Sequence, residues 1–180
     1  MPMSFERPIV LLVARVLGAA CAHAGASGGS GVLPVGSPAP TFSTADQAGK
    51  QVVLADLRGQ SVVLYFYPKD DTPGCTKEAC SFRDAWSPLQ KAGVVVLGVS
   101  EQDAASHTAF AEKYHLPFQL LVDDKGAIAA AYHVPVTLGF AKRITYLIGK
   151  DGNIAHVWPD VTPVGHANEI LAVVNGAPAP

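Results

Sequence analysis

The segment over residues 61–67, Ser-Val-Val-Leu-Tyr-Phe-Tyr, limits the possible folds of this chain more than any other segment. After its first residue it contains only β-branched, aliphatic and aromatic side chains, which favour a strand, without alternating polar residues. A strand that is apolar on both faces has to be covered on both faces, as in the sheets of α/β proteins. We therefore predict an α/β domain built around this buried strand.

A helix that carries a reactive cysteine is predicted directly after this strand. Thr72 is a favourable N-cap residue and Pro73 suits the first helical position, so we expect a helix over residues 73–86. Cys75 then occupies the third position, where its backbone N–H would donate to the Thr72 hydroxyl. The positive end of the helix dipole favours the thiolate over the thiol. We interpret Cys75 as a nucleophile.

A second cysteine, Cys80, lies five residues further along the same helix. On a regular helix this spacing separates the two Cα atoms by about 8 to 9 Å, which exceeds the roughly 7 Å that a disulfide can span. A bridge that forms during turnover, while the first helical turn unwinds, fits the spacing. A reduced pair of core residues and a static disulfide remain alternatives. A zinc site is disfavoured because the chain has no Cys-x-x-Cys or paired His motif.

The composition indicates one globular domain with a sizeable core, because 49% of the 180 residues are hydrophobic and only 16% are charged. The formal net charge of −2 provides neither a basic surface for nucleic acid nor a polybasic patch for membrane association. We therefore expect partners that are small molecules or proteins.

The first 24 residues resemble a secretory signal peptide. Arg7 precedes an apolar run over residues 9–20, and Ala22-His-Ala24 is typical of a signal peptidase site. A lipoprotein signal through Cys21 is disfavoured, because Gly18 stands where an aliphatic side chain is preferred. A functional signal predicts a periplasmic or secreted protein, and without one the protein would be cytoplasmic. The predicted divisions are a signal peptide over residues 1–24, a Gly/Ser linker over 25–31, the folded domain over 32–176 and a tail over 177–180.

Strands and helices alternate along the rest of the domain. Residues 39–44 and 51–57 are predicted to form an N-terminal β-hairpin, and residues 94–100 a second buried strand that completes a βαβ crossover. The fold class is thus a mixed central sheet flanked by helices, with the thiol at the carboxyl end of a central strand. Further helices are expected over 103–115, 127–133 and 166–175, and further strands over 119–122, 143–148 and 154–158.

These residues resemble the peroxiredoxins, and within them the Q-type, bacterioferritin-comigratory-protein-like branch. The pattern Pro68-x-x-x-Thr72-x-x-Cys75 matches the active-site signature of the superfamily, and Cys80 matches the resolving position of the Q-type branch. Arg143 opens the strand where the family keeps its active-site arginine. The resemblance covers residues 33–175, and it includes Leu97-Gly-Val-Ser100, Phe110-Ala-Glu-Lys-Tyr114, Leu116-Pro-Phe118 and Lys150-Asp-Gly152.

The resemblance implies a thioredoxin-like fold and a thiol-specific peroxidase that reduces hydrogen peroxide and organic hydroperoxides without a metal or other cofactor. Cys80 would attack the sulfenic acid formed on Cys75, and a thioredoxin-like or glutaredoxin-like reductant would reduce the resulting intramolecular disulfide. The resemblance also implies a monomer and a role in antioxidant defence.

The resemblance also implies roles for the residues around the sulfur. Cys75 would attack the peroxide, while Arg143 and Thr72 would donate hydrogen bonds to the sulfur and to the peroxide oxygens. Pro68 would exclude water, and Glu78 would orient the arginine.

Two competing functions follow from the same cysteines. A thiol-disulfide oxidoreductase on a thioredoxin fold would be expected to have Cys-x-x-Cys, whereas four residues separate Cys75 and Cys80. A non-enzymatic binding domain would keep the pair as a permanent disulfide. The six histidines show no metal-binding spacing and are interpreted as structural or exposed, and Tyr65, Phe66 and Trp86 as core or pocket wall.

Overall fold

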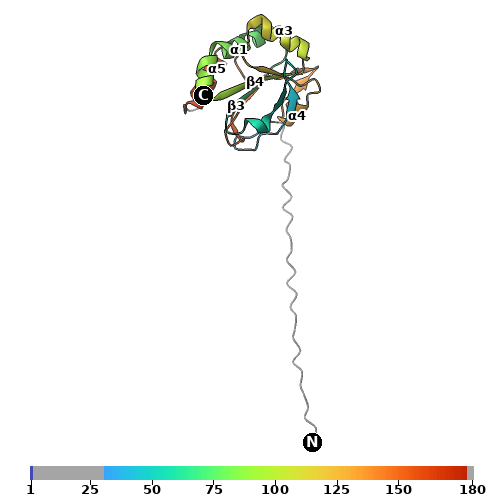
Figure 1. The fold of residues 1–180 in the computed structure, drawn as a ribbon, viewed down its shortest axis with the longest axis vertical. Coiled ribbons are helices and arrows are strands. Elements are labelled where there is room, and N and C mark those ends of the chain that lie inside the picture. The colour runs from blue at the N-terminus through green and yellow to red at the C-terminus, as the bar shows by residue number, and fades with distance from the viewer. Residues whose placement is uncertain (2–30, 178–180) are drawn as a thin grey trace.

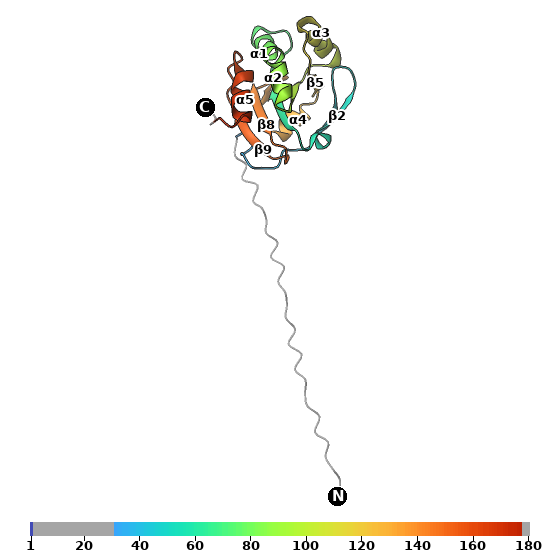
Figure 2. The ribbon, with the colours of Figure 1, turned by 60° about the vertical axis from the view of Figure 1, so that its left-hand side comes forward.

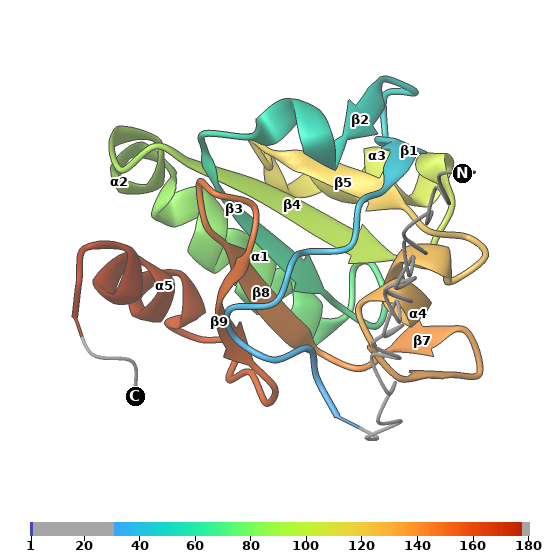
Figure 3. The same cartoon turned by 90° about the horizontal axis from the view of Figure 1, so that it is seen from below.

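A five-stranded mixed sheet with the strand order β5-β4-β3-β8-β9 forms the centre of the molecule (Figures 1 and 3). The computed structural model describes residue 1 and residues 31–177. The predicted buried strand is β3, which pairs in parallel with β4 and antiparallel with β8, so it is central as expected. The strands of this sheet are β3 (Ser61–Phe66), β4 (Val94–Ser100), β5 (Gln119–Val122), β8 (Ile144–Ile148) and β9 (Ile154–Trp158).

The connection from β3 to β4 contains two helices, α1 (Pro73–Asp84) and α2 (Trp86–Lys91). The predicted helix therefore ends two residues earlier than expected, at Asp84, with Ala85 as its C-cap. Pro88 explains this break, because it lacks the N–H that would continue the helical hydrogen bonds to the carbonyl of residue 84. The break separates the segment that carries both cysteines from α2.

The remaining helices agree with the sequence pattern within a few residues. They are α3 (Ala104–Tyr114), α4 (Ala127–Ala131) and α5 (His166–Val174). The α3 helix begins at Asp103, whose carboxylate accepts a hydrogen bond from the backbone N–H of Ser106 at 2.8 Å. Figure 2 shows α1, α2 and α5 together on the same side of the sheet, and α1 contacts both of the other two.

Two hairpins lie outside the central sheet. The predicted N-terminal hairpin is present as β1 (Ser43–Ala45) and β2 (Gln51–Val53), but both strands are shorter than expected, since the first begins at residue 43 and not 39. A 3₁₀ helix over Leu54–Leu57 replaces the end of the second strand and buries Leu54 in the core. The second hairpin, β6 (Val136–Thr137) with β7 (Phe140–Ala141), was not predicted because each of its strands has only two residues.

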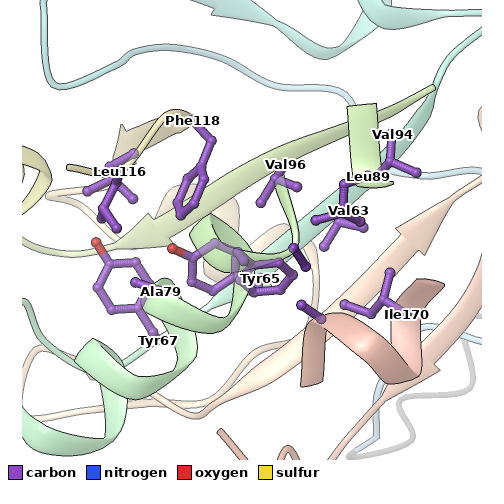
Figure 4. Packing of buried hydrophobic residues seen from close by; sticks show 14 of the residues in the cluster. Val63, Tyr65, Tyr67, Ala79, Leu89, Val94, Val96, Leu116, Phe118 and Ile170 are labelled. Carbon is purple, nitrogen blue, oxygen red and sulfur yellow. The ribbon is translucent and has the colours of Figure 1, made fainter. Parts of the chain in front are cut away.

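The core consists of two apolar clusters, one on each face of the sheet. Successive residues of β3 point to opposite clusters, so Val63 and Tyr65 face α1, whereas Leu64 and Phe66 face α4. Figure 4 shows Tyr65 and Tyr67 close to Ala79 of α1, with the two tyrosine rings stacked at 5.4 Å. This packing holds the start of α1 against the carboxyl end of β3. Tyr65 and Phe66 are both core residues, as predicted, in opposite clusters, and Trp86 is partly buried against the cluster that contains Tyr65.

Several predictions concern residues outside the described part of the chain. These are the signal peptide over residues 1–24 with Cys21, most of the linker over 25–31 and most of the tail over 177–180. Within residues 31–177, every helix is too short or too polar to cross a membrane.

Candidate active site

The first turn of α1 lies where the sequence predicts it, with Thr72 as N-cap and Pro73 in the first position. The Thr72 side chain, however, does not cap the helix. Its hydroxyl donates to the carbonyl oxygen of Lys69 at 3.1 Å, within the turn that precedes the helix. The predicted hydrogen bond to the Cys75 N–H is therefore wrong. Because the single hydroxyl hydrogen of Thr72 is donated to Lys69, the expected hydrogen bond from Thr72 to the Cys75 sulfur is not made in this structure either.

Arg143 reaches Cys75 because of the sheet register. In the pairing of β3 with β8, Phe66 lies opposite Ile144, so the residue before β8 is placed next to the carboxyl end of β3. The Nη2 atom of Arg143 lies 3.2 Å from the Sγ atom of Cys75. A Cβ atom on Gly74 would lie 3.3 Å from the same nitrogen, so a residue without a side chain leaves room for this approach.

Glu78 binds the other side of the same guanidinium, since Arg143 Nη1 donates to its Oε2 atom. The Glu78 side chain is completely buried, and its second oxygen has no hydrogen-bond partner. Burial raises the pKa of Glu78 to about 7, although Arg143 lowers it. Burial also lowers the pKa of Arg143, but Glu78 and Cys75 raise it by more. The guanidinium therefore remains a cation beside the sulfur.

Cys75 and Cys80 have different surroundings although they share α1. Cys75 is buried, with 2% of its surface exposed, whereas Cys80 is half-buried. Cys80 lines a groove of about 680 Å³ between α1, α2 and the start of α5, together with Lys77, Asp84 and Val164. Both cysteines are free thiols in this structure. The intact helix agrees with the expectation that a disulfide between them requires unwinding.

The structure brings Cys75, Arg143 and Glu78 into direct contact, and it places Thr72 at the start of the same helix. Pro68 follows the end of β3 and is partly exposed. Cys80 does not contact this group through a hydrogen bond in the described part of the chain, although it lies on the same helix.

Three buried polar residues near the site were not singled out from the sequence. Asp70, Tyr67 and His107 form a hydrogen-bonded group between the loop after β3 and α3. The helical spacing contained a signal for one of them, because His107 precedes Phe110 and Ala111 by three and four residues and is buried with them. The interpretation of the histidines as structural agrees with His107, and with His166, which contacts the Thr145 hydroxyl at 2.9 Å.

A buried cysteine beside a guanidinium can act as a nucleophile toward small electrophiles that fit its pocket, and peroxides are cleaved by such an attack on the O–O bond. Together with the mixed α/β sheet, this arrangement is typical of the class of cysteine-dependent peroxidases.

Known proteins identify the particular family. Residues 35–157 match the model of the AhpC/TSA family. A Coxiella burnetii protein named as a peroxiredoxin bcp is 49% identical over 146 residues, which are 77% of this chain and 97% of the relative. The chloroplastic peroxiredoxin Q of Triticum aestivum is 44% identical over 147 residues, with 80% and 68% covered. The chain belongs to the AhpC/TSA family, and its relatives confirm the Q-type resemblance.

Solved structures confirm the fold. The peroxidoxin BcpB of Mycobacterium tuberculosis superposes with a TM-score of 0.75 at 33% identity, over 79% of this chain and 97% of that protein. The bacterioferritin comigratory protein of Xanthomonas campestris, whose alkyl peroxide reduction has been studied structurally, gives 0.70 at 32% identity, over 74% and 90%. The predicted thioredoxin-like fold is therefore correct. The chain is a thiol peroxidase of the thioredoxin-dependent peroxiredoxins, and the two competing functions lose their support.

Proposed function

We propose that Cys75 is the peroxidatic cysteine of this peroxidase. Its sulfur lies at the N-terminus of α1 and 3.2 Å from a guanidinium nitrogen of Arg143, and this contact is the observation that supports the assignment most directly. The Cys75 thiolate attacks the terminal oxygen of the hydroperoxide. An S–O bond forms as the O–O bond breaks, and the departing alkoxide or hydroxide takes up one proton. The products are the sulfenic acid of Cys75 and an alcohol or water.

Arg143 and Thr72 act on the peroxide during this step. Arg143 stabilises the negative charge of the thiolate and then the negative charge that develops on the departing oxygen. The Thr72 hydroxyl already donates to Lys69, so its lone pairs are left to accept the O–H of the peroxide. Glu78 keeps the guanidinium in this orientation through its contact with Nη1. Pro68, which lacks an N–H, limits the access of water.

Cys80 is the resolving cysteine in this proposal. After local unwinding of α1, its sulfur attacks the sulfenic acid, so that an S–S bond forms and water leaves. The half-buried position of Cys80 in the groove supports a role that requires movement. A thioredoxin-like or glutaredoxin-like reductant then returns the disulfide to two thiols. The Xanthomonas relative acts on alkyl peroxides, and we extend this substrate class to the present chain together with hydrogen peroxide.

Single-turnover oxidation tests these roles. Reduced protein is mixed with one equivalent of peroxide, and the loss of thiols is followed in the wild type, Cys75→Ser and Cys80→Ser. We expect fast loss of both thiols in the wild type, a trapped sulfenic acid in Cys80→Ser and no fast reaction in Cys75→Ser. Rapid peroxide consumption by Cys75→Ser would exclude Cys75 as the peroxidatic residue.

We also propose that residues 1–24 direct export and that the mature protein begins at Gly25 and is a monomer. The small residues at positions 22 and 24 and the preceding apolar run support this proposal. Mass spectrometry of the protein from its native host tests the start of the chain, and light scattering tests the monomer. A mature chain that retains residues 1–24 would argue against cleavage at this site.

A further inference from the structure

The loop that connects β3 with α1 is attached to α3 by two adjacent aspartates in different environments. The exposed Asp71, whose φ angle is 56°, accepts hydrogen bonds from Lys113 Nζ at 2.6 Å and from the Tyr114 hydroxyl at 2.5 Å. Asp70 is instead buried, with 6% of its surface exposed. The loop therefore has one attachment in solvent and one in the core, next to each other in sequence.

The buried attachment satisfies both carboxylate oxygens of Asp70. Its Oδ1 atom accepts from the Tyr67 hydroxyl at 2.7 Å. Its Oδ2 atom accepts from the Ser106 hydroxyl at 2.7 Å and contacts His107 Nδ1 at 2.8 Å. The other nitrogen of this ring, Nε2, lies 3.2 Å from the carbonyl oxygen of Leu121 in β5. Both ring nitrogens of His107 thus lie within hydrogen-bond distance of an oxygen atom, and these two contacts fix the orientation of the ring.

The surroundings of Asp70 favour its charged form. Burial raises the pKa of Asp70, but hydrogen bonds and charge from His107, together with the hydroxyls of Ser106 and Tyr67, lower it by more, so that it lies below its ordinary value. Tyr67 lies in the core close to α1 (Figure 4). The hydrogen bonds to both carboxylate oxygens hold this part of the loop in a fixed place, and that place suggests a use in the site.

The position of this group next to the active site indicates that use. Asp70 lies two residues after Pro68 and two residues before Thr72, the two loop residues proposed to act on the peroxide. The residues that hold Asp70 follow β3 or belong to α3, His107 in turn contacts β5, and none of these hydrogen bonds involves α1. The hydrogen bonds of the attachment can therefore persist while α1 unwinds, although Tyr67 also packs near that helix.

We propose that Asp70 and His107 are positioning residues that hold Pro68 and Thr72 in the geometry required for attack on a peroxide. The inference rests on the proposed role of Cys75. The sulfur of Cys75 contacts Arg143 and lies at the N-terminus of α1, and neither Asp70 nor His107 is hydrogen-bonded to it, so the pair acts on the alignment of the O–O bond and not on the general reactivity of the sulfur. Because the attachment lies outside α1, the same geometry is restored each time α1 refolds.

Two reactions of the Cys75 sulfur distinguish an effect on the alignment of the O–O bond from an effect on the general reactivity of the sulfur. The rate of Cys75 oxidation by hydrogen peroxide is compared with the rate of its alkylation by iodoacetamide, which needs a thiolate but no alignment of an O–O bond. For Asp70→Asn we expect the peroxide rate to fall by about tenfold to a hundredfold, since small misplacements have effects of this size. The alkylation rate should change by less than about threefold. Equal losses in both reactions, or an unchanged peroxide rate, would overturn the proposal.

Conservative variants of His107 provide a second test. In His107→Asn the amide nitrogen can take the place of Nδ1 and donate to Asp70, whereas His107→Leu cannot donate. We expect His107→Asn to keep the peroxide rate within about threefold of the wild type and His107→Leu to lose about tenfold or more. Similar losses in both variants would contradict the role of this hydrogen bond. Ser106→Ala, which removes one hydrogen bond without leaving a buried charge unpaired, gives a milder variant if the others do not fold.

Asp71→Asn is the matched control, because it changes the neighbouring residue in the same loop, with partners on the same helix but in solvent. We expect it to change both rates by less than about twofold, as for exposed ion pairs. A loss as large as that of Asp70→Asn would show that any attachment of the loop suffices and would overturn the specific role of the buried pair. Rapid peroxide consumption by Cys75→Ser would instead contradict the proposed function itself.

Discussion

Cys75 and Cys80 lie on the same helix, yet the rest of the protein surrounds them very differently. Cys75 is buried, contacts Arg143, the residue before β8, and follows a loop that is attached to α3. Cys80 is half-buried and opens to a groove. One sulfur is thus fixed by residues distant in sequence, and the other is held mainly by its helix. The difference teaches that two cysteines on one helix can have unequal constraints, which fits the separate roles proposed for them.

The largest effect is expected when the positive charge next to Cys75 is removed. We expect Arg143→Gln to lower the rate of peroxide reduction by about a hundredfold to a thousandfold, as is typical when a fixed donor in an active site is removed. Stopped-flow measurement of Cys75 oxidation gives the rate. Arg83→Gln is the control, because Arg83 lies three residues after Cys80 and binds Asp84 and the Tyr114 carbonyl instead. If the rate of peroxide reduction fell by less than tenfold in Arg143→Gln, the contact with Arg143 would not account for the difference between Cys75 and Cys80.

The next effect concerns the stability of the buried side of the site. The pKa of Glu78 rises from an ordinary value of 4.5 to about 7 in the folded protein. Between these values the folded state holds a proton that the unfolded state has lost, so the stability falls as the pH rises through this window and then becomes constant. The full effect corresponds to roughly 3 kcal/mol. Urea denaturation of the wild type and Glu78→Gln across this pH range measures the difference in their free energies of unfolding. If the wild type became more stable relative to Glu78→Gln as the pH rises, the prediction would be contradicted.

A smaller effect is expected on catalysis by the same substitution. Glu78→Gln leaves an oxygen that can accept from Arg143 but removes the negative charge, so the guanidinium is oriented less firmly. We expect the peroxide rate to fall by about tenfold, as for other residues that orient a reactive group. Glu112→Gln, on the exposed surface of α3, should leave the rate unchanged. An unchanged rate in Glu78→Gln would show that Arg143 is positioned without its help.

The smallest effect concerns the mobility of Cys80. Lys77 is an exposed residue of α1 between the two cysteines, and glycine destabilises a helix by about 1 kcal/mol relative to alanine. If resolution requires unwinding, Lys77→Gly should form the disulfide about fivefold faster than Lys77→Ala, with the same rate of peroxide attack. The fluorescence of Trp86, which lies two residues after the end of α1, is used to follow disulfide formation. Equal rates of disulfide formation would indicate that unwinding does not limit resolution.

The sequence predicted those parts of the molecule that depend on neighbouring residues. The apolar run of β3 and the start of α1 at Thr72 and Pro73 follow from local patterns, and both were confirmed. The Thr72 hydroxyl bonds Lys69 instead of the helix, because the turn before α1 places another acceptor within its reach. The β6–β7 hairpin has strands too short to produce a pattern.

The parts of the site that join distant segments were harder to predict. Arg143 was found through the resemblance to a family, since its distance to Cys75 depends on the pairing of β3 with β8. Asp70 and His107 are 37 residues apart, and neither has a sequence context that indicates the other. Two successive aspartates in a loop look alike in the sequence, whereas only one of them is buried in the fold.

The contact between Arg143 and Cys75 also has a consequence for the biogenesis of the protein. The two residues are 68 positions apart in the chain, and the arginine is synthesised long after the cysteine. A nascent chain therefore lacks the contact between the guanidinium and the sulfur until β8 has been made and has paired with β3. With the roles proposed for Arg143 and Cys75, we expect peroxide reactivity to arise only after this pairing, so that the unfinished polypeptide is spared from oxidation at this sulfur.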